Sequence, residues 1–405
     1  MILKIPKVSI STIFVIIPIL YFNSCTFEFI KNFSFVLPIV IACVLLWLLL
    51  LSREKVVIDI HNILPMGIFV LILGVLFLLG TQNQVSVLLT DLTNAIYLLF
   101  FMFVFAIYSG KHYKNDRGLI LFVCITDAII SCVYSIYRLI EDPNLSRLLS
   151  TGSYHETYEA IEARGVVSFG VVYGLVLILL VLFFLILQKK KHRISNILLF
   201  SLFTVTLFFA QFMIAILLVG IGIIWILIIN NDNKKNKTRF FFFIIAGVIC
   251  IFILPVLLVI IVENNILGYE INARLEEILG LFRGESLEGT DLLARFSQYF
   301  MSLSAFISSY GMGKIAMNSV EVGGHSQWLD GFGNYGIIFI LYIVALFTFR
   351  KFVIKKLPNK NAKRVYQVVF AIYIIMSLIN TSAWAPITLN LYVIIPFLCL
   401  EKISE

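Results

Sequence analysis

Long apolar runs separated by short polar connections make up most of this sequence. Of its 405 residues, 60% are hydrophobic and 13% are charged, whereas a soluble domain is about half apolar and a quarter charged. Because one membrane crossing takes about 20 apolar residues, the pattern predicts an all-α polytopic membrane protein, with one integral membrane domain over residues 1–405. The apolar windows give twelve transmembrane helices, at residues 8–22, 33–52, 64–80, 92–109, 118–139, 166–188, 196–210, 212–230, 239–262, 325–349, 365–384 and 386–400.

Two regions of this assignment have alternatives. Residues 8–22 resemble a signal peptide, but they lack a small-residue cleavage site, so we expect an uncleaved first helix. Residues 195–230 contain no charge and fit either one very long helix or two spans. We expect two spans, joined by a tight hairpin at Ala210 and Gln211.

The basic residues test the number of spans independently, because cytoplasmic loops are enriched in lysine and arginine. With twelve spans, 23 of the 31 basic residues fall on one side of the membrane. The sequence therefore predicts that both termini are cytoplasmic. The net charge of +8 then follows from topology, and the K-K-K-H-R run at residues 189–193 is interpreted as a cytoplasmic loop. We expect no nucleic-acid partner.

Two long segments then face outward, at residues 141–165 and 263–324. The smaller holds five acidic and two basic residues, and the larger holds eight and four, so the outer face is net acidic. Long segments outside the spans of a compact membrane protein usually carry function. In the larger one we expect short amphipathic helices, among them a helix at residues 291–308 that lies on the membrane surface.

His325 is the outward-facing histidine best placed for chemistry. It follows Gly323 and Gly324 and opens the predicted span 325–349. The unpaired N–H groups and the dipole of a helix N-terminus favour a neutral imidazole there and also attract anions. A neutral imidazole beside a bound phosphate can act as a general base. The alternative is an interfacial histidine with a structural role only.

Two arginines are candidates for holding a phosphorylated ligand, because a guanidinium group binds phosphate oxygens bidentately. Arg164 directly precedes the sixth span. Arg295 lies in the expected surface helix, off its apolar stripe, together with Gln298 and Ser302. Each arginine also has a plainer interpretation: Arg164 could reach lipid headgroups, and Arg295 could form an i, i+4 ion pair with Asp291.

Other motifs indicate no site. G-F-G-N-Y-G at residues 331–336 matches a dinucleotide-binding fingerprint literally, but it lies within a predicted transmembrane helix, so its glycines indicate close helix packing. Asp127, near the middle of a span, is a candidate ion relay or an interhelical hydrogen-bonding group. No outward cluster of carboxylates and histidines has metal-ligand spacing. We expect neither a metal nor another cofactor.

Four stretches together resemble a known family. They read E-A-R-G-V-V-S-F-G at residues 162–170, G-T-D-L-L-A-R-F-S-Q-Y at 289–299, Y-G-M-G at 310–313 and G-G-H-S-Q-W-L-D-G-F-G-N-Y-G-I at 323–337. This order resembles the Wzy-type O-antigen and capsular polysaccharide polymerases and the related O-antigen ligases. In that family an arginine-bearing outer helix leads through a G-x-G turn to a histidine that opens a span. The chain departs from many members at Ser326, where they have asparagine, and at Ala210–Gln211, where they have a Ser-Arg pair.

The resemblance implies a metal-independent glycosyltransferase of the GT-C-like class in the bacterial cytoplasmic (inner) membrane. On the outer face it would transfer a polyprenyl-pyrophosphate-linked glycan onto the sugar hydroxyl of another lipid-linked repeat unit. Arg164 and Arg295 would stabilise the departing pyrophosphate, and His325 would take the acceptor proton. The further substrate-binding candidates are Arg274, Arg283 and Trp328. The implied partners are the lipid-linked donor and acceptor, membrane lipids, and chain-length regulator and flippase proteins.

Two other functions compete with this one. A ligase that transfers a finished glycan to a different acceptor shares every motif above. A flippase for lipid-linked oligosaccharides has a similar number of spans, but transport alone does not call for a long outer segment that ends in Gly-Gly-His.

Overall fold

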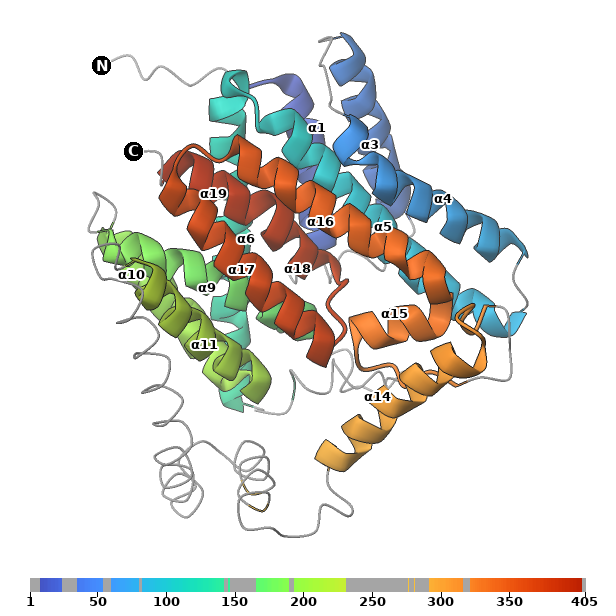
Figure 1. The fold of residues 1–405 in the computed structure, drawn as a ribbon. Helices are drawn as coiled ribbons and strands as arrows, with labels where there is room; N and C mark the ends of the chain where they lie inside the picture. Colours follow the sequence, from blue (N-terminus) through green and yellow to red (C-terminus); the bar gives the residue numbers. More distant parts are fainter. Residues whose placement is uncertain are drawn as a thin grey trace, which may run out of the picture.

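The computed structural model describes residues 8–23, 35–53, 60–79, 82–141, 145, 165–188, 193–230, 276, 280, 291–315 and 321–402. Every regular element in these ranges is helical (Figure 1). Six of the described helices are long and apolar enough to cross a membrane, and five more are apolar but shorter. This agrees with the predicted all-α polytopic membrane fold. The predicted span at 239–262 lies outside the described residues.

The longer helices follow one another along the chain with short 3₁₀ and π segments between some of them. They are α1 (Ile10–Asn23), α3 (Val36–Arg53), η1 (Ile60–Asn62), α4 (Leu64–Leu79), α5 (Gln82–Tyr108), η2 (Lys111–Tyr113), α6 (Lys114–Glu141), α9 (Phe169–Leu187), α10 (Arg193–Phe209), α11 (Met213–Asn230), α14 (Asp291–Ser308), α15 (Gln327–Tyr335), η3 (Gly336–Ile338), α16 (Phe339–Lys356), α17 (Lys360–Ile379), α18 (Ala385–Leu389), η4 (Asn390–Ile394) and α19 (Ile395–Lys402).

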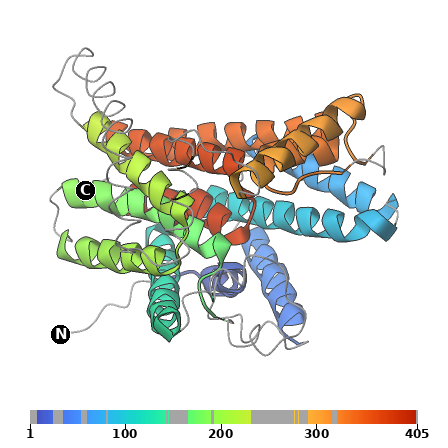
Figure 2. The same ribbon diagram turned by 90° about the horizontal axis from the view of Figure 1, so that it is seen from below.

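Two segments form the centre of the bundle, α9 and the continuous helical run from α18 to α19. Nearly every residue of α9 is buried, and so are residues 385–399 apart from Pro386. An uncharged helix that is apolar on all sides is expected inside a helical protein. Figure 2 shows α16 and α17 on one side of this centre and α1, α3 and α6 on the other.

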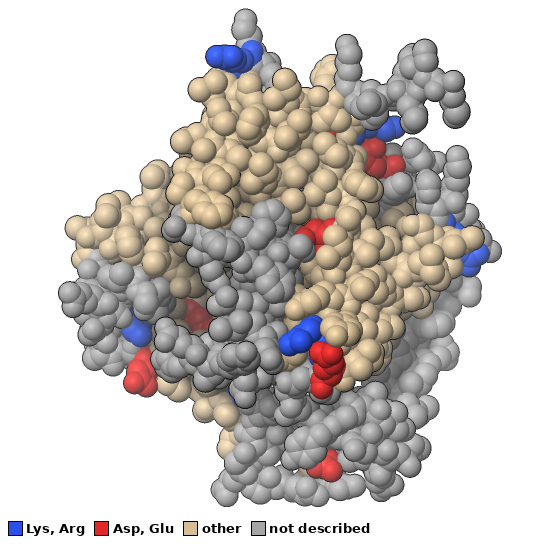
Figure 3. All heavy atoms as spheres, turned by 180° about the vertical axis from the view of Figure 1, so that it is seen from behind, with Lys and Arg blue, Asp and Glu red and all other residues tan. Residues whose placement is uncertain are grey.

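The outer helices expose large apolar side chains. In α3, Val40, Cys43 and Trp47 are buried, whereas Leu45 and Leu49 on the opposite face are exposed. Charged side chains are sparse among the described atoms of the face seen in Figure 3. Soluble monomers rarely expose contiguous apolar surface of this kind, and a lipid-facing bundle requires it.

The segment around residue 325 differs from the single inward helix that the sequence predicted. α15 ends at Gly336, whose φ of +56° is a left-handed conformation that breaks an α-helix. Figure 1 shows α15 running across the end of α16 rather than along its axis. His325 therefore precedes a short separate helix. The predicted placement of G-F-G-N-Y-G inside one continuous span is wrong.

Other boundaries also differ from the sequence-based expectation. α5 begins ten residues earlier than the predicted span 92–109, and α17 ends at Ile379 instead of continuing to residue 384. Residues 195–230 form two helices, α10 and α11, with a break at 210–212, where Gln211 has a φ of +57°. Both helices pack against α9.

Polar contacts join three distant parts of the chain at one end of the bundle. The backbone N–H of Ser9 donates to Asp116 Oδ1 over 2.8 Å, which ties the start of α1 to the start of α6. Arg117 forms an ion pair with Glu401 in α19, with 2.6 Å between Nη2 and Oε1. The residues before α1 and the end of α19 therefore lie on the same side of the protein.

Candidate functional site

α14 turns its polar face toward the rest of the protein. Ser302 is completely buried, and Arg295 and Gln298 are half-buried on the same side. Phe300 and Ile307, on the opposite side, are 69% and 64% exposed. The expected surface helix is therefore present, and the residues off its apolar stripe point inward.

The G-x-G segment after α14 forms a tight turn against the end of α15. Gly311 and Gly313 have φ values of +81° and +76°. A β-carbon at Gly313 would lie 2.6 Å from the Asn334 carbonyl oxygen. The N–H of Lys314 donates to the Gly333 carbonyl over 2.8 Å, and the N–H of Ile337 donates to the Gly311 carbonyl over 2.9 Å. Only glycine allows the two backbones this approach.

Residues 323–326, which carry His325, are held against both α14 and α15. A β-carbon at Gly323 would lie 2.1 Å from the Gln298 carbonyl oxygen, so this residue touches the backbone of α14. Asp330 Oδ2 accepts a hydrogen bond from the N–H of Ser326 over 2.8 Å. The Ser326 hydroxyl in turn caps α15 by accepting from the N–H of Leu329 over 3.2 Å.

The connection between α17 and α18 brings the start of α9 to the same place. The Asn380 side-chain amide donates to the Tyr173 hydroxyl of α9 over 3.0 Å. The Asn380 carbonyl accepts from the N–H of Gln327 over 3.3 Å. The Tyr299 hydroxyl of α14 donates to the Ile379 carbonyl over 2.7 Å. Residues 379–380 thus connect α9, α14 and α15.

Charges reach across this junction. Burial raises the pKa of the Tyr299 hydroxyl, and the nearby positive charge of Arg295 opposes that rise. Arg295 is also within electrostatic range of the Tyr173 hydroxyl, and His325 is within electrostatic range of the Asp330 carboxylate. The site therefore combines a cation on α14 with an imidazole and a carboxylate at the start of α15.

Three of the predicted arginines, Arg164, Arg274 and Arg283, lie outside the described residues. The residue after Arg164, Gly165, is buried with a φ of +84°. Farther along α9, a β-carbon at Gly170 would lie 3.1 Å from the Trp384 β-carbon. The start of α9 thus packs beside the 379–384 connection that also contacts Gln327. Trp328, the predicted substrate-binding tryptophan, is half-buried in the first turn of α15.

Sequence reasoning missed three polar residues at this junction. Asp330 was inside a predicted span and Asp91 just before another, yet neither was singled out. The Tyr335 hydroxyl donates to the Asp91 carboxylate, and Ser302 bonds Asp330. The spacing of four residues between Ser326 and Asp330 is a signal that could have identified Asp330, because helix starts favour serine and an acidic residue in the first turn.

The arrangement suits transfer chemistry on a phosphorylated substrate. A guanidinium can stabilise negative charge on a leaving phosphate, and an imidazole can take a proton. Gln298 Oε1 is buried and has no hydrogen-bond partner within the described part of the chain, so it can accept a bond from a ligand hydroxyl. Among the described residues, no group of three histidine, cysteine or acidic side chains could hold a metal ion.

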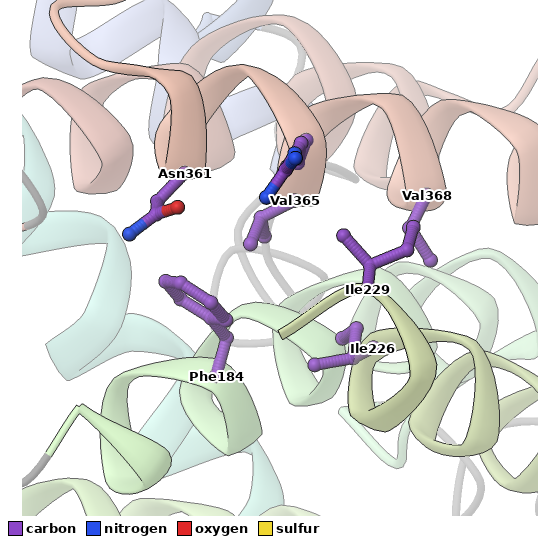
Figure 4. A pocket seen from close by; sticks show the side chains of 7 residues that line it. Phe184, Ile226, Ile229, Asn361, Val365 and Val368 are labelled. Atoms are coloured by element: carbon purple, nitrogen blue, oxygen red, sulfur yellow. The ribbon is translucent and has the colours of Figure 1, made fainter. Parts of the chain in front are cut away.

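The one described cavity with well-defined walls lies elsewhere. It is lined by residues of α9, α11 and α17 (Figure 4), namely Phe184, Ile226, Ile229, Asn361, Arg364, Val365 and Val368. Phe184 is near the end of α9 and Arg364 is near the start of α17, whereas the junction around His325 involves the opposite ends of both helices. The two places are separate.

No protein-family model, curated protein or solved structure matches the chain.

Proposed function

We propose that the protein is a polysaccharide polymerase that acts on the outer face of the bacterial cytoplasmic membrane. It transfers a glycan from a polyprenyl-pyrophosphate donor to a sugar hydroxyl of another lipid-linked repeat unit. The observation that carries the proposal is the contact between α14 and residues 323–326, where Gly323 touches Gln298, one turn after Arg295. This contact brings an arginine and a histidine, far apart in the sequence, to one junction.

In the proposed reaction, the bond between the donor sugar and its pyrophosphate breaks while the acceptor oxygen bonds to the same sugar carbon. His325 takes the proton of the acceptor hydroxyl as the new bond forms. Arg295 and Arg164 neutralise the charge that develops on the departing pyrophosphate, because their planar guanidinium groups each hold two oxygens. Gln298 Oε1 accepts a hydrogen bond from a sugar hydroxyl.

The proposed topology has twelve spans, with both termini cytoplasmic. Two observations support it. The start of α1 and the end of α19 are tied to α6 at one end of the bundle, and α14 exposes apolar side chains as a helix at the lipid surface does. The 291–326 region is then outside, where lipid-linked repeat units are polymerised in this scheme.

The test is a polymerisation assay with the full-length protein in lipid nanodiscs and lipid-linked repeat unit as the only substrate. We expect a glycan ladder from the wild-type protein. The variant His325→Ala should lose about 10²–10⁴-fold in rate, as expected when a general base is removed. His61→Ala, in the exposed η1 turn, is the matched control and should polymerise normally.

The same assay separates the alternatives. A ligase would form no ladder from repeat units alone and would transfer glycan only when a different acceptor is added. A flippase would form no product in either case but would move the lipid-linked substrate across the bilayer. Normal chain lengths from His325→Ala, at equal amounts of folded protein, would contradict the proposed reaction.

A further inference from the structure

The carboxylate of Asp330 bonds to groups on both sides of His325. Oδ1 accepts from the N–H of Gly324 over 3.2 Å, and Oδ2 accepts from the N–H of Ser326 over 2.8 Å. Gly324 has a φ of +84°, a conformation that a chain does not hold without support. One carboxylate therefore fixes the backbone directly before and directly after the histidine.

Ser302 extends this arrangement to the other helix. Its hydroxyl donates to Asp330 Oδ1 over 2.5 Å and accepts from the N–H of Gly323 over 3.0 Å. Ser302 is completely buried and lies on the polar face of α14, two turns after Arg295. The same bonds thus join the helix that carries the arginine to the segment that carries the histidine.

Helix capping alone does not account for these contacts. α15 already has a capping side chain, because the Ser326 hydroxyl accepts from the N–H of Leu329. Two of the three partners of Asp330, Gly324 and Ser302, lie outside α15. A carboxylate with only a capping role would bond the first amides of its own helix.

We infer that Asp330 and Ser302 form a clamp that positions His325 relative to Arg295 for the transfer reaction. This inference rests on the proposed function. Asp330 is a positioning residue in this scheme, because it acts through the backbone around the histidine. Its negative charge, within electrostatic range of His325, also favours the imidazolium that forms when His325 takes a proton.

The first measurement does not depend on activity. Amide hydrogen exchange is followed in residues 321–326 of the full-length protein in nanodiscs, for Asp330→Ala and Ser302→Ala. We expect faster exchange of this segment in both variants, by about two- to tenfold for each lost hydrogen bond. Ser304→Ala, at an exposed position of the same helix, is the control and should leave the exchange unchanged. Unchanged exchange in Asp330→Ala would overturn the clamp whatever the protein catalyses.

The second measurement is the polymerisation rate. If the clamp positions the base, Asp330→Ala should lower kcat by about 10²-fold, the effect of misplacing a reacting group by about 1 Å. The KM for the lipid-linked donor should change little, because Asp330 does not contact the donor in this scheme. Faster exchange with a normal kcat, in a protein whose His325→Ala variant is inactive, would overturn the positioning role.

A disulfide can replace the clamp and so separates positioning from any direct part in the chemistry. A β-carbon at Gly333 of α15 would lie 3.2 Å and 3.3 Å from the two Val322 methyl carbons, an approach that suits a disulfide. In Asp330→Ala, the added pair Val322→Cys and Gly333→Cys should restore slow exchange and most of kcat when oxidised, but not when reduced. The single cysteine variants control for the crowding at residue 333.

The outcomes remain distinguishable from failure of the proposed function. If the oxidised pair restores slow exchange but not kcat, Asp330 acts in the chemistry itself and the positioning role is overturned. If His325→Ala polymerises normally, His325 leaves the mechanism and no base remains for the clamp to position. The exchange measurement still reports, in that case, whether Asp330 and Ser302 hold the 323–326 segment.

Discussion

Tyr335, the last residue of α15, donates a hydrogen bond from its hydroxyl to the carboxylate of Asp91 in α5. Tyr335 is buried, and the next residue, Gly336, breaks the helix. The bond therefore fixes the end of α15 against a long helix of the bundle, while the bonds of Asp330 fix its start. Both ends of the short helix that follows His325 are attached to other elements.

Loss of this bond should destabilise the protein. In Tyr335→Phe the ring remains but Asp91 loses its donor, which should lower the free energy of unfolding by about 1–3 kcal/mol, as expected for a buried polar group left without its partner. Thermal unfolding of the purified protein in detergent measures the change. Tyr310→Phe, at a residue that is 89% exposed, should unfold at the wild-type temperature. Equal stability of the two variants would mean that the Asp91–Tyr335 bond is not maintained.

The break at Gly336 should tolerate no side chain. A β-carbon there would lie 2.1 Å from the Gly311 carbonyl oxygen, in addition to the strain of a φ of +56°. We expect Gly336→Ala to reduce the yield of folded protein strongly, because backbone atoms on both sides would have to move. Gly67→Ala is the control, since a β-carbon at that helical position meets nothing within 4 Å. Size-exclusion profiles of the two variants give the comparison, and a normal Gly336→Ala profile would contradict the close approach of the two turns.

Charge alone should not replace the arginines. Arg295→Lys and Arg164→Lys keep a positive charge, but an ammonium cannot hold two pyrophosphate oxygens as a guanidinium does. Each variant should lose most of its polymerising activity in the nanodisc assay. Arg193→Lys, at the exposed start of α10, should be unaffected. Near-normal ladders from both test variants would return the two arginines to interfacial anchoring, for which lysine suffices.

Labelling from outside the cell tests the twelve-span topology. Cysteines placed singly at Glu285 and Lys235 should react differently with a membrane-impermeant reagent, because the first position is predicted to be outside and the second inside. In intact cells we expect labelling at 285 only, and in opened cells labelling at both. The reverse pattern would place the 263–324 segment in the cytoplasm and rule out an extracellular reaction there.

The helical membrane fold and half of the candidate site were predictable from the sequence, because they depend on local patterns. Apolar runs of membrane-spanning length predicted helices at most of the observed places. The 3.6-residue period of α14 separated Arg295, Gln298 and Ser302 from the apolar stripe, and the structure turns this side inward. The G-x-G turn followed from the freedom of glycine at positive φ. Arg164, Arg274 and Arg283, outside the described residues, stay predictions.

Tertiary structure decided which polar groups meet. Ser302 and Asp330 are 28 positions apart, Tyr299 and Ile379 are 80 apart, and Tyr335 and Asp91 are 244 apart. Periodicity within one helix carries no information on such pairs, since they depend on how whole helices pack. The break at Gly336 has the same origin: hydropathy reads continuously from residue 325 to 349, and only the close approach of Gly311 forces the chain to turn there. Hydrophobic length therefore determined the helices, and packing between them determined the surroundings of His325.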